Sequence, residues 1–176
     1  ERYYAQYQKA ITLGAQNKVQ DKISVLKGIV SSDRGDYVGA AYYELGRTYI
    51  SSEEYQKGVA TLKDFVEKYP DSEHYAQALS DLGLAYANLG NKQEALKYYD
   101  KVIKSAPKSS QSKGALEGVR EIYMSDGDAE AYFNYAETVG MEGDLSVVAR
   151  DSMSYASAQK LYLDKKIVFA FTIQRS

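Results

Sequence analysis

The chain has 176 residues, of which 44% are hydrophobic and 26% charged, a composition typical of folded proteins and not of disordered ones. Its 22 basic and 24 acidic residues are interspersed and leave a net charge of −2, so we expect no nucleic-acid partner. The absence of cysteine excludes disulfides and zinc–thiolate sites, and no apolar run approaches the roughly 20 residues that a membrane span needs.

The first two predicted helices cover residues 1–14 and 18–31, which we expect to pack as an antiparallel pair. Apolar residues in the second segment recur every three or four positions, as they do on one face of a helix. They match a stripe that lies further along the chain: Val19, Ile23, Leu26, Ile29 and Val30 answer to Tyr55, Val59, Leu62, Phe65 and Val66.

The next pair is predicted over residues 37–50 and from Ser51 to Pro70. Ser51 with Glu54 forms a capping-box pattern, in which each side chain bonds to the backbone of the other residue at the start of a helix. Pro70 lacks the N–H that a helix interior requires, so we expect it to close the second helix of this pair.

A third pair follows with similar signals at the helix ends. Asp71 or Ser72 is expected to cap a helix that ends at Gly90, where a left-handed backbone is favoured. Asn91 with Glu94 is a second capping box, and the helix that it opens ends before another proline.

The remaining chain keeps the helical pattern with fewer turn signals. Asp144 is expected to cap the last helix, which should end in a turn at residues 164–166. Residues 167–173 are β-branched and aromatic, so we expect residues 167–176 to form an apolar tail that does not belong to the repeats. The predicted helices of this part cover residues 110–125, 129–139 and 145–164.

Two stretches of the chain repeat one another at a spacing of 37 residues, which is typical of a solenoid. A Leu-Gly-x-x-Tyr motif, a small residue nine positions later, an aromatic or Leu four positions after that and a closing Pro resemble the tetratricopeptide repeat. The residues that carry the resemblance are Leu45, Gly46, Tyr49, Gly58, Leu62 and Pro70, answered by Leu82, Gly83, Tyr86, Ala95, Tyr99 and Pro107.

The resemblance implies an all-α, right-handed superhelical solenoid of antiparallel helix pairs, in which Gly46 and Gly83 let two helices approach closely. Beyond residues 39–72 and 76–109 the helical pattern continues without most of the motif residues. The expected units cover residues 1–35, 36–72, 73–109, 110–143 and 144–166.

The link between the two best repeats is longer than usual for this family. Tyr69-Pro70-Asp71-Ser72 before an Ala-rich helix resembles tetratricopeptide proteins of bacterial envelopes, such as the Tol–Pal coordinator type and outer-membrane assembly lipoproteins. This resemblance implies a periplasmic or envelope-associated location, and the cytoplasm is the alternative. The chain begins at Glu1 without a Met or a signal peptide, so we expect a fragment or a processed form.

No motif in the chain indicates catalysis. His74 is the one histidine, it lies beside a predicted helix start, and the sequence shows no partner that would make it a base. Glu117 and Glu121 are spaced like a carboxylate pair, but Lys113 and Arg120 beside them favour a solvated face. Metal-ligand spacing and phosphate-binding glycine motifs are absent, so we expect no enzyme activity, no metal and no cofactor.

In this family, the first helices of successive units line a concave groove that holds a peptide or a helix of a partner protein. Such a lining mixes aromatic, aliphatic and polar side chains. In its most specific form, this hypothesis predicts that replacing Tyr43 and Arg47 by alanine weakens the binding of a partner peptide and leaves the fold intact. Counted from the motif residues, the expected lining is Tyr7, Ile11, Tyr43, Arg47, Ile50, Leu84, Asn88, Glu117 and Glu121.

Two classes of function remain open from the sequence. The first is an adaptor or scaffold that binds a protein or peptide in the groove. The second is a structural spacer or oligomerisation segment of a larger envelope protein, which would use its convex face or associate with itself through the ends of the array.

Overall fold

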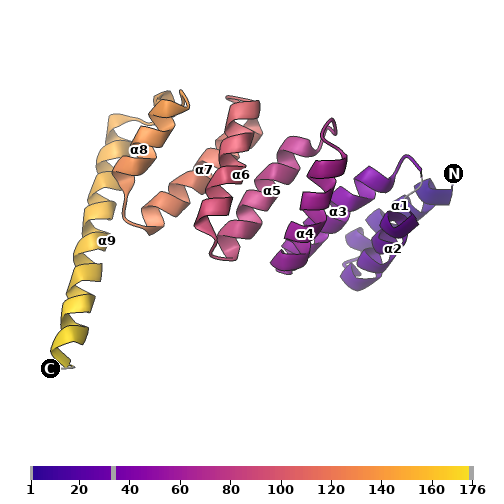
Figure 1. Cartoon of the computed structure of the whole chain (residues 1–176), viewed down its shortest axis with the longest axis horizontal. Coiled ribbons are helices and arrows are strands. Elements are labelled where there is room, and N and C mark those ends of the chain that lie inside the picture. The colour runs from indigo at the N-terminus through magenta and orange to yellow at the C-terminus, as the bar shows by residue number, and fades with distance from the viewer. Residues whose placement is uncertain (1, 33–34, 175–176) are drawn as a thin grey trace.

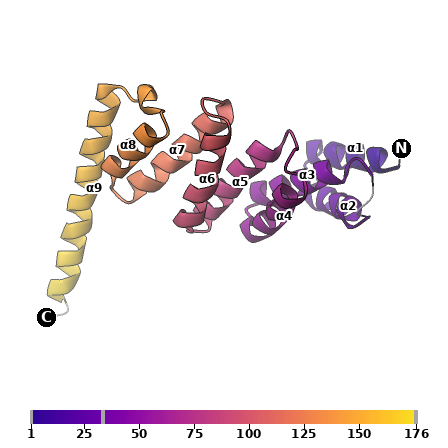
Figure 2. The ribbon, with the colours of Figure 1, turned by 45° about the horizontal axis from the view of Figure 1, so that its top comes forward.

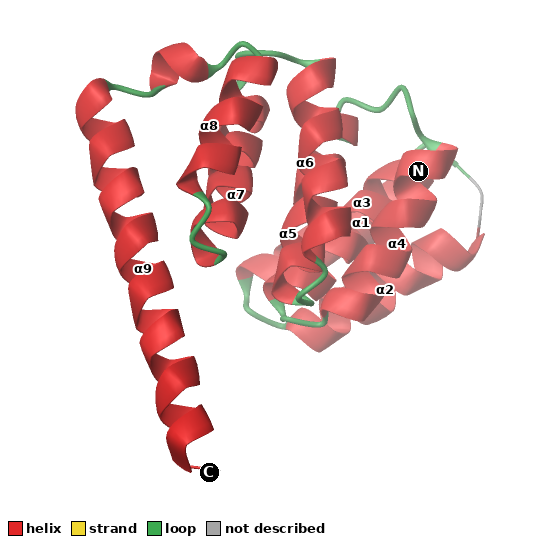
Figure 3. Cartoon of the chain, turned by 60° about the vertical axis from the view of Figure 1, so that its left-hand side comes forward, coloured by secondary structure: helices red, strands yellow, loops and turns green. Residues whose placement is uncertain are grey.

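The computed structural model describes residues 2–32 and 35–174, which form an elongated all-α array (Figure 1). Nine α-helices, one 3₁₀ turn (η1) and no strand make up these described segments, and Figure 3 shows helices and loops alone. The predicted all-α class is therefore confirmed. The elements in chain order are α1 (Arg2–Ala15), α2 (Val19–Ser32), α3 (Val38–Ser51), α4 (Tyr55–Lys68), α5 (Tyr75–Asn88), α6 (Lys92–Ser105), α7 (Ser110–Ser125), α8 (Ala129–Thr138), η1 (Glu142–Asp144) and α9 (Val147–Gln174).

The helices pack as successive pairs along the long axis (Figures 1 and 2). Each helix contacts its neighbours in sequence, and α5 also contacts α3 and α7, so first helices of adjacent pairs lie side by side. The core runs through the middle of this stack, where Leu26, Leu62, Phe65, Leu79 and Leu82 are almost fully buried. These residues occupy the three- and four-residue stripes that the sequence predicted.

Close helix–helix contacts occur where the repeat motif places glycine. A Cβ at Gly46 would collide with Leu62, and a Cβ at Gly83 would lie 2.5 Å from Tyr99 Cε1. The prediction that these two glycines permit a close approach is therefore confirmed. Gly118 of α7 meets the same Tyr99 ring from the other side, with its would-be Cβ 2.5 Å from Cζ.

Several predicted helix signals work as expected. Gly90 adopts a left-handed φ of 76° directly after α5. Asn91 caps α6, because its Oδ1 accepts a bond of 3.2 Å from the N–H of Glu94. The reciprocal half of this capping box is not formed, since the Asn91 N–H donates to the Tyr86 carbonyl and Glu94 pairs with Lys97.

Two other predicted caps are wrong. Ser51 is the last residue of α3 and donates to the Thr48 carbonyl, so Glu54 holds the N-cap position of α4 without a side-chain bond. Neither Asp71 nor Ser72 is the N-cap of α5, which is His74, although the Ser72 hydroxyl accepts from the His74 N–H at 3.2 Å.

The C-terminal helix differs most from its prediction. Asp144 lies in η1, and the cap of α9 is Ser146, whose hydroxyl accepts from the Ala149 N–H at 3.1 Å. The turn expected at residues 164–166 is wrong, because α9 continues as one helix to Gln174. Its far end extends past the rest of the array (Figure 1). Among the described residues, no helix combines the length and the hydrophobicity needed to cross a membrane.

A buried hydroxyl joins α9 to the pair before it. Ser157 of α9 is 6% exposed and accepts a bond of 3.1 Å from the backbone N–H of Ala129, the first residue of α8. Arg150 lies over the Phe133 ring at 5.3 Å. These contacts fix the first half of α9 against α8 and leave its second half outside the stack.

Candidate functional site

The strongest candidate site lies on the face that α3, α5 and α7 share. A first hollow of about 330 Å³ opens between α3 and α5, and Arg47, Ile50, Asp81, Leu84 and Asn88 all line it. Four of these five side chains were predicted to meet in a groove, and the structure brings them together. Asp81 was not among the predicted residues.

A second hollow, of about 250 Å³, lies between α5 and α7. It shares Leu84 and Asn88 with the first hollow, and Glu121 and Tyr99 also line it. Leu84 is 46% exposed, so an apolar side chain projects between the two hollows. We call these two hollows together the groove.

A third hollow follows between α7 and α9. It has a volume of about 370 Å³, and Glu117, Arg120 and Met153 contribute to its wall. Glu117 forms an ion pair with Arg120 one turn away on the same helix. The predicted residue Glu117 therefore lies outside the groove and already has a counter-charge.

Asp81 is the most buried charge of the groove. Gln77 donates from Nε2 to Oδ1 at 3.1 Å, while Oδ2 is buried and accepts no hydrogen bond. Arg47 Nε lies 3.8 Å from Oδ2, which allows charge attraction but is too long for a hydrogen bond. Loss of water raises the pKa of Asp81 above its usual value, and the bond from Gln77 and the charge of Arg47 oppose this rise.

Tyr99 of α6 lines the second hollow. Its ring is held between Gly83 of α5 and Gly118 of α7. Burial is the main cause that raises the pKa of its hydroxyl to about 12, and the negative charges of Glu121 and Asp81 add to the effect. The hydroxyl therefore stays protonated at neutral pH and remains a hydrogen-bond donor.

Tyr43 does not line the groove as predicted. It is 6% exposed, its ring stacks on His74 with centroids 4.4 Å apart, and it packs against Phe65 at 5.5 Å. The Arg47 guanidinium lies over the ring, 5.6 Å from its centroid. Tyr43 thus packs beneath Arg47, and its burial leads us to expect that Tyr43→Ala destabilises the fold.

Tyr7 and Ile11 lie on α1, away from both hollows. Tyr7 is half-buried against Tyr37, with ring centroids 5.7 Å apart, and Ile11 is exposed. The structure therefore does not bring these two predicted residues together with Arg47 and Leu84.

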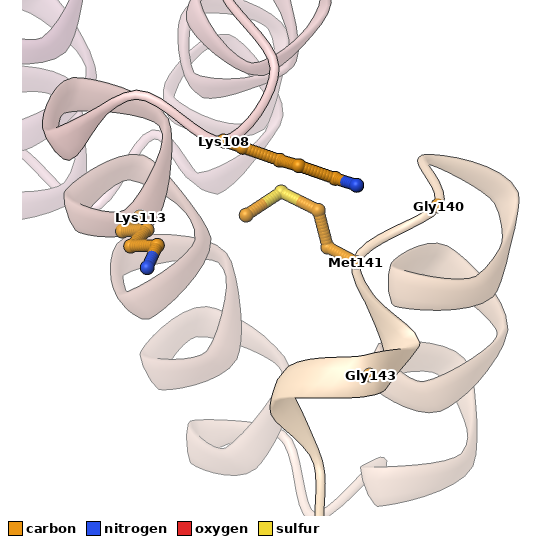
Figure 4. A pocket seen from close by; sticks show the side chains of 5 residues that line it. All are labelled: Lys108, Lys113, Gly140, Met141 and Gly143. Carbon is orange, nitrogen blue, oxygen red and sulfur yellow. The ribbon is translucent and has the colours of Figure 1, made fainter.

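One further hollow lies at the edge of the array, where the loop before α7 meets the segment between α8 and α9. It has a volume of about 240 Å³. Figure 4 shows the Lys108 side chain reaching across it beside Met141, with Lys113 on the neighbouring helix. Among the side chains that the structure describes, no cluster of three or more metal-ligating residues occurs.

Asp81 and Tyr99 are groove-lining residues that the sequence analysis did not predict. Asp81 precedes the Leu82-Gly83 motif, as Glu44 precedes Leu45-Gly46, so a charge repeated at this position was the available signal. The two carboxylates have different surroundings, because Glu44 accepts a bond of 2.6 Å from Lys22. Nothing in the sequence indicated that Tyr99, from the second helix of its pair, lines the groove.

Comparison with known proteins supports the repeat assignment. Residues 43–110 match the family model of the tetratricopeptide repeat. The protein CTR9 homolog of Arabidopsis thaliana is 31% identical to this chain over 108 residues, which are 60% of the chain. This chain spans 9% of the length of that relative.

Several solved structures share the fold. Nearly identical TPR-like repeats from a Podosopora anserina protein named as a kinesin light chain align with a TM-score of 0.64 and 18% identity, over 99% of this chain and 97% of theirs. A tetratricopeptide repeat protein from Parabacteroides merdae aligns with a TM-score of 0.66 and 17% identity, over 97% and 64%. MamA aligns with a TM-score of 0.58 and 21% identity, over 93% and 81%.

Tetratricopeptide repeats generally mediate protein–protein interactions and are generally not enzymes. The similar solved structures have low sequence identity to this chain, so they indicate its fold and nothing about its function. Residues 43–110 of this chain are therefore similar to the tetratricopeptide repeat, and the helical array around them has the TPR-like solenoid fold.

Proposed function

We propose that this chain is a protein–protein interaction module that binds a peptide or a helix of a partner protein in the groove. The observation that carries the proposal is the exposed Leu84 between two hollows. Sites for peptides combine apolar pockets with a few polar groups that fix the orientation of the ligand. Arg47, Asp81 and Glu121 supply such polar groups around Leu84.

The position of Arg47 also supports this proposal. Its guanidinium lies over Tyr43, which Phe65 and His74 hold in place. A cation supported in this way loses less conformational entropy on binding than a free surface side chain. Arginine is also among the residue types that dominate binding energy at interfaces.

The experiment uses random peptides displayed on phage, selected against the immobilised chain. Selected peptides are then labelled and titrated with the chain and with its Leu84→Ser variant by fluorescence anisotropy. Loss of the exposed leucine between the two hollows should weaken binding about tenfold or more.

The matched control is Leu163→Ser on α9, because Leu163 is similarly exposed, at 50%, and lies far along the array. It should leave the affinity of the same peptides unchanged. Peptides that lose affinity with Leu163→Ser and retain it with Leu84→Ser would overturn the groove proposal.

The alternative function is a spacer or an oligomerisation segment that associates with itself through the ends of the array. It is favoured by Val148 and Tyr155, which lie seven residues apart on α9 and are 74% and 72% exposed. Such spacing lets one helix face pack against a second helix. Light scattering after size exclusion should then show a dimer that Val148→Ser and Tyr155→Ser dissociate.

Periplasmic or envelope location is a separate proposal that rests on the Tyr69-Pro70-Asp71-Ser72 link, with the cytoplasm as its alternative. Fractionation of cells that express the protein from its natural gene would decide between the two compartments. Recovery in the periplasmic or membrane fraction is expected, and recovery in the cytosol would overturn this proposal.

A further inference from the structure

Two carboxylates face the groove from neighbouring helices. Asp81 of α5 lines the first hollow, and Glu121 of α7 lines the second hollow. Leu84 projects between the two hollows. A ligand that covers Leu84 therefore has a negative charge on either side of its apolar contact.

Asp81 lacks a hydrogen-bond donor at one of its two oxygens. Gln77 serves Oδ1 at 3.1 Å, whereas Oδ2 is buried without a hydrogen bond and lies 3.8 Å from Arg47 Nε. A buried charged acceptor without a hydrogen-bond donor lowers the free energy of unfolding, because its lost contacts with water are not replaced. Because Arg47 makes no hydrogen bond to Oδ2 and is half-exposed, a donor from a ligand can take the vacant position when Arg47 turns aside.

The cations near the groove leave its negative charge only partly compensated. Lys92 lines the second hollow, but its ammonium group donates to Asp126 and to Ser125 Oγ at 3.0 Å. Glu121 is exposed and forms no ion pair with any side chain that the structure describes. Among the described residues that line the two hollows, Arg47 is thus the one cation without a hydrogen-bonded carboxylate. Its single positive charge faces the two negative charges of Asp81 and Glu121.

We propose that the partner segment bound in the groove is basic, with a lysine or arginine that donates to Asp81 and an adjacent apolar side chain that packs on Leu84. This proposal rests on the proposed function and adds the charge of the ligand to it. Glu121 favours a second basic residue on the other side of the apolar contact. Charge-assisted hydrogen bonds are the strong ones in such sites, and opposite charge also speeds association.

The first test compares the composition of peptides selected from the random phage library. Selection against the chain should enrich lysine and arginine beside an apolar residue. Selection against Asp81→Asn should reduce this enrichment. The control variant is Asp64→Asn, which removes an exposed carboxylate of α4 outside the groove and should leave the enrichment unchanged.

The second test is a double-mutant cycle on one selected peptide. Replacing its lysine by glutamine should weaken binding about tenfold to the chain, and much less to the Asp81→Asn variant. Such coupling shows direct pairing, because a general charge effect would weaken both complexes alike.

The outcomes separate this proposal from the proposed function. Peptides that depend on Leu84 but are acidic or uncharged would overturn the basic ligand and leave the groove function standing. A lysine effect of equal size in both proteins would also overturn it. A selection without any peptide that depends on Leu84 would overturn both proposals.

Discussion

Asp81 shows what burial does to an ionisable side chain of the groove. Its carboxylate is 15% exposed, keeps one hydrogen bond from Gln77 and has Arg47 within reach of charge attraction alone. Desolvation outweighs both favourable contacts, so the pKa of Asp81 is raised. A buried carboxylate with a raised pKa that lines a groove fits the proposed binding role of this face.

The Asp81→Asn variant should be more stable than the parent chain at pH 7. Because the folded pKa lies above the unfolded value of 3.8, the folded state binds the proton more tightly. The unfolding free energy of the parent chain therefore falls as the pH rises between the two pKa values. The Asp81→Asn variant lacks this carboxylate and should keep its stability over the same pH range. Urea unfolding at several pH values should show the advantage at pH 7 and its decrease toward acid pH.

The control for this stability prediction is Asp64→Asn, at an exposed position of α4. It should change the unfolding free energy by less than about 0.5 kcal/mol. An Asp81→Asn variant that unfolds at lower urea than the parent at pH 7 would show that Arg47 and Gln77 compensate the carboxylate fully.

At the scale of the elements, Tyr99 joins two helix pairs. Its ring extends from α6 into the space between α5 and α7, where Gly83 and Gly118 leave room for it. This side chain therefore sets the approach of two first helices and also lines the second hollow. The geometry of the groove depends on a side chain that comes from the second helix of its pair.

Gly83→Ala should destabilise the chain by about 1–3 kcal/mol. The new Cβ would lie 2.5 Å from the Tyr99 ring, which cannot retreat because Gly118 confines its other side. Urea unfolding followed by circular dichroism measures the change.

Gly114→Ala is the matched control, because this helical glycine of α7 has no atom within 4 Å of the would-be Cβ. The free energy of unfolding of this variant should rise by up to about 1 kcal/mol, since alanine has a higher helix propensity than glycine. Equal effects of the two substitutions would contradict the close contact at Tyr99.

At the scale of the whole molecule, the main contacts between the described helices join each helix pair to its neighbours along the array. The stability of such a solenoid is approximately a sum over pairs and their interfaces. The middle pairs have neighbours on both sides, whereas α1 lies at one end and the second half of α9 extends beyond the stack (Figure 1). The ends should therefore open more easily than the middle.

Hydrogen exchange followed by mass spectrometry should show this gradient. Amides of α4, α5 and α6 should exchange most slowly, and those of residues 166–174 should exchange fastest among the helices. Protection of residues 166–174 that equals the protection of α5, and that rises with protein concentration, would indicate that another copy covers this segment.

Much of the fold could be predicted from the sequence, because its signals are local. The left-handed turn at Gly90, the cap at Asn91 and the buried position of Leu62 depend on residues within a few positions of each other or on a helical stripe. The cap predicted at Ser51 failed because α3 continues through it. The continuation of α9 was missed because β-branched and aromatic residues favour strands in isolation, although helical context overrides this preference.

The sequence by itself determined that this chain is a helical repeat array, and it placed Arg47, Ile50, Leu84 and Asn88 on one face. Spacing within each helix pairs Arg47 with Ile50 and Leu84 with Asn88, since residues three or four positions apart share a face. That the two helices line one groove is what the resemblance to the tetratricopeptide repeat implied. Only the tertiary structure decided that Tyr43 lies beneath Arg47 and that Asp81 faces the groove with one oxygen lacking a donor. Burial and hydrogen bonding depend on neighbouring helices, whose side chains meet through space and leave no mark in the local pattern.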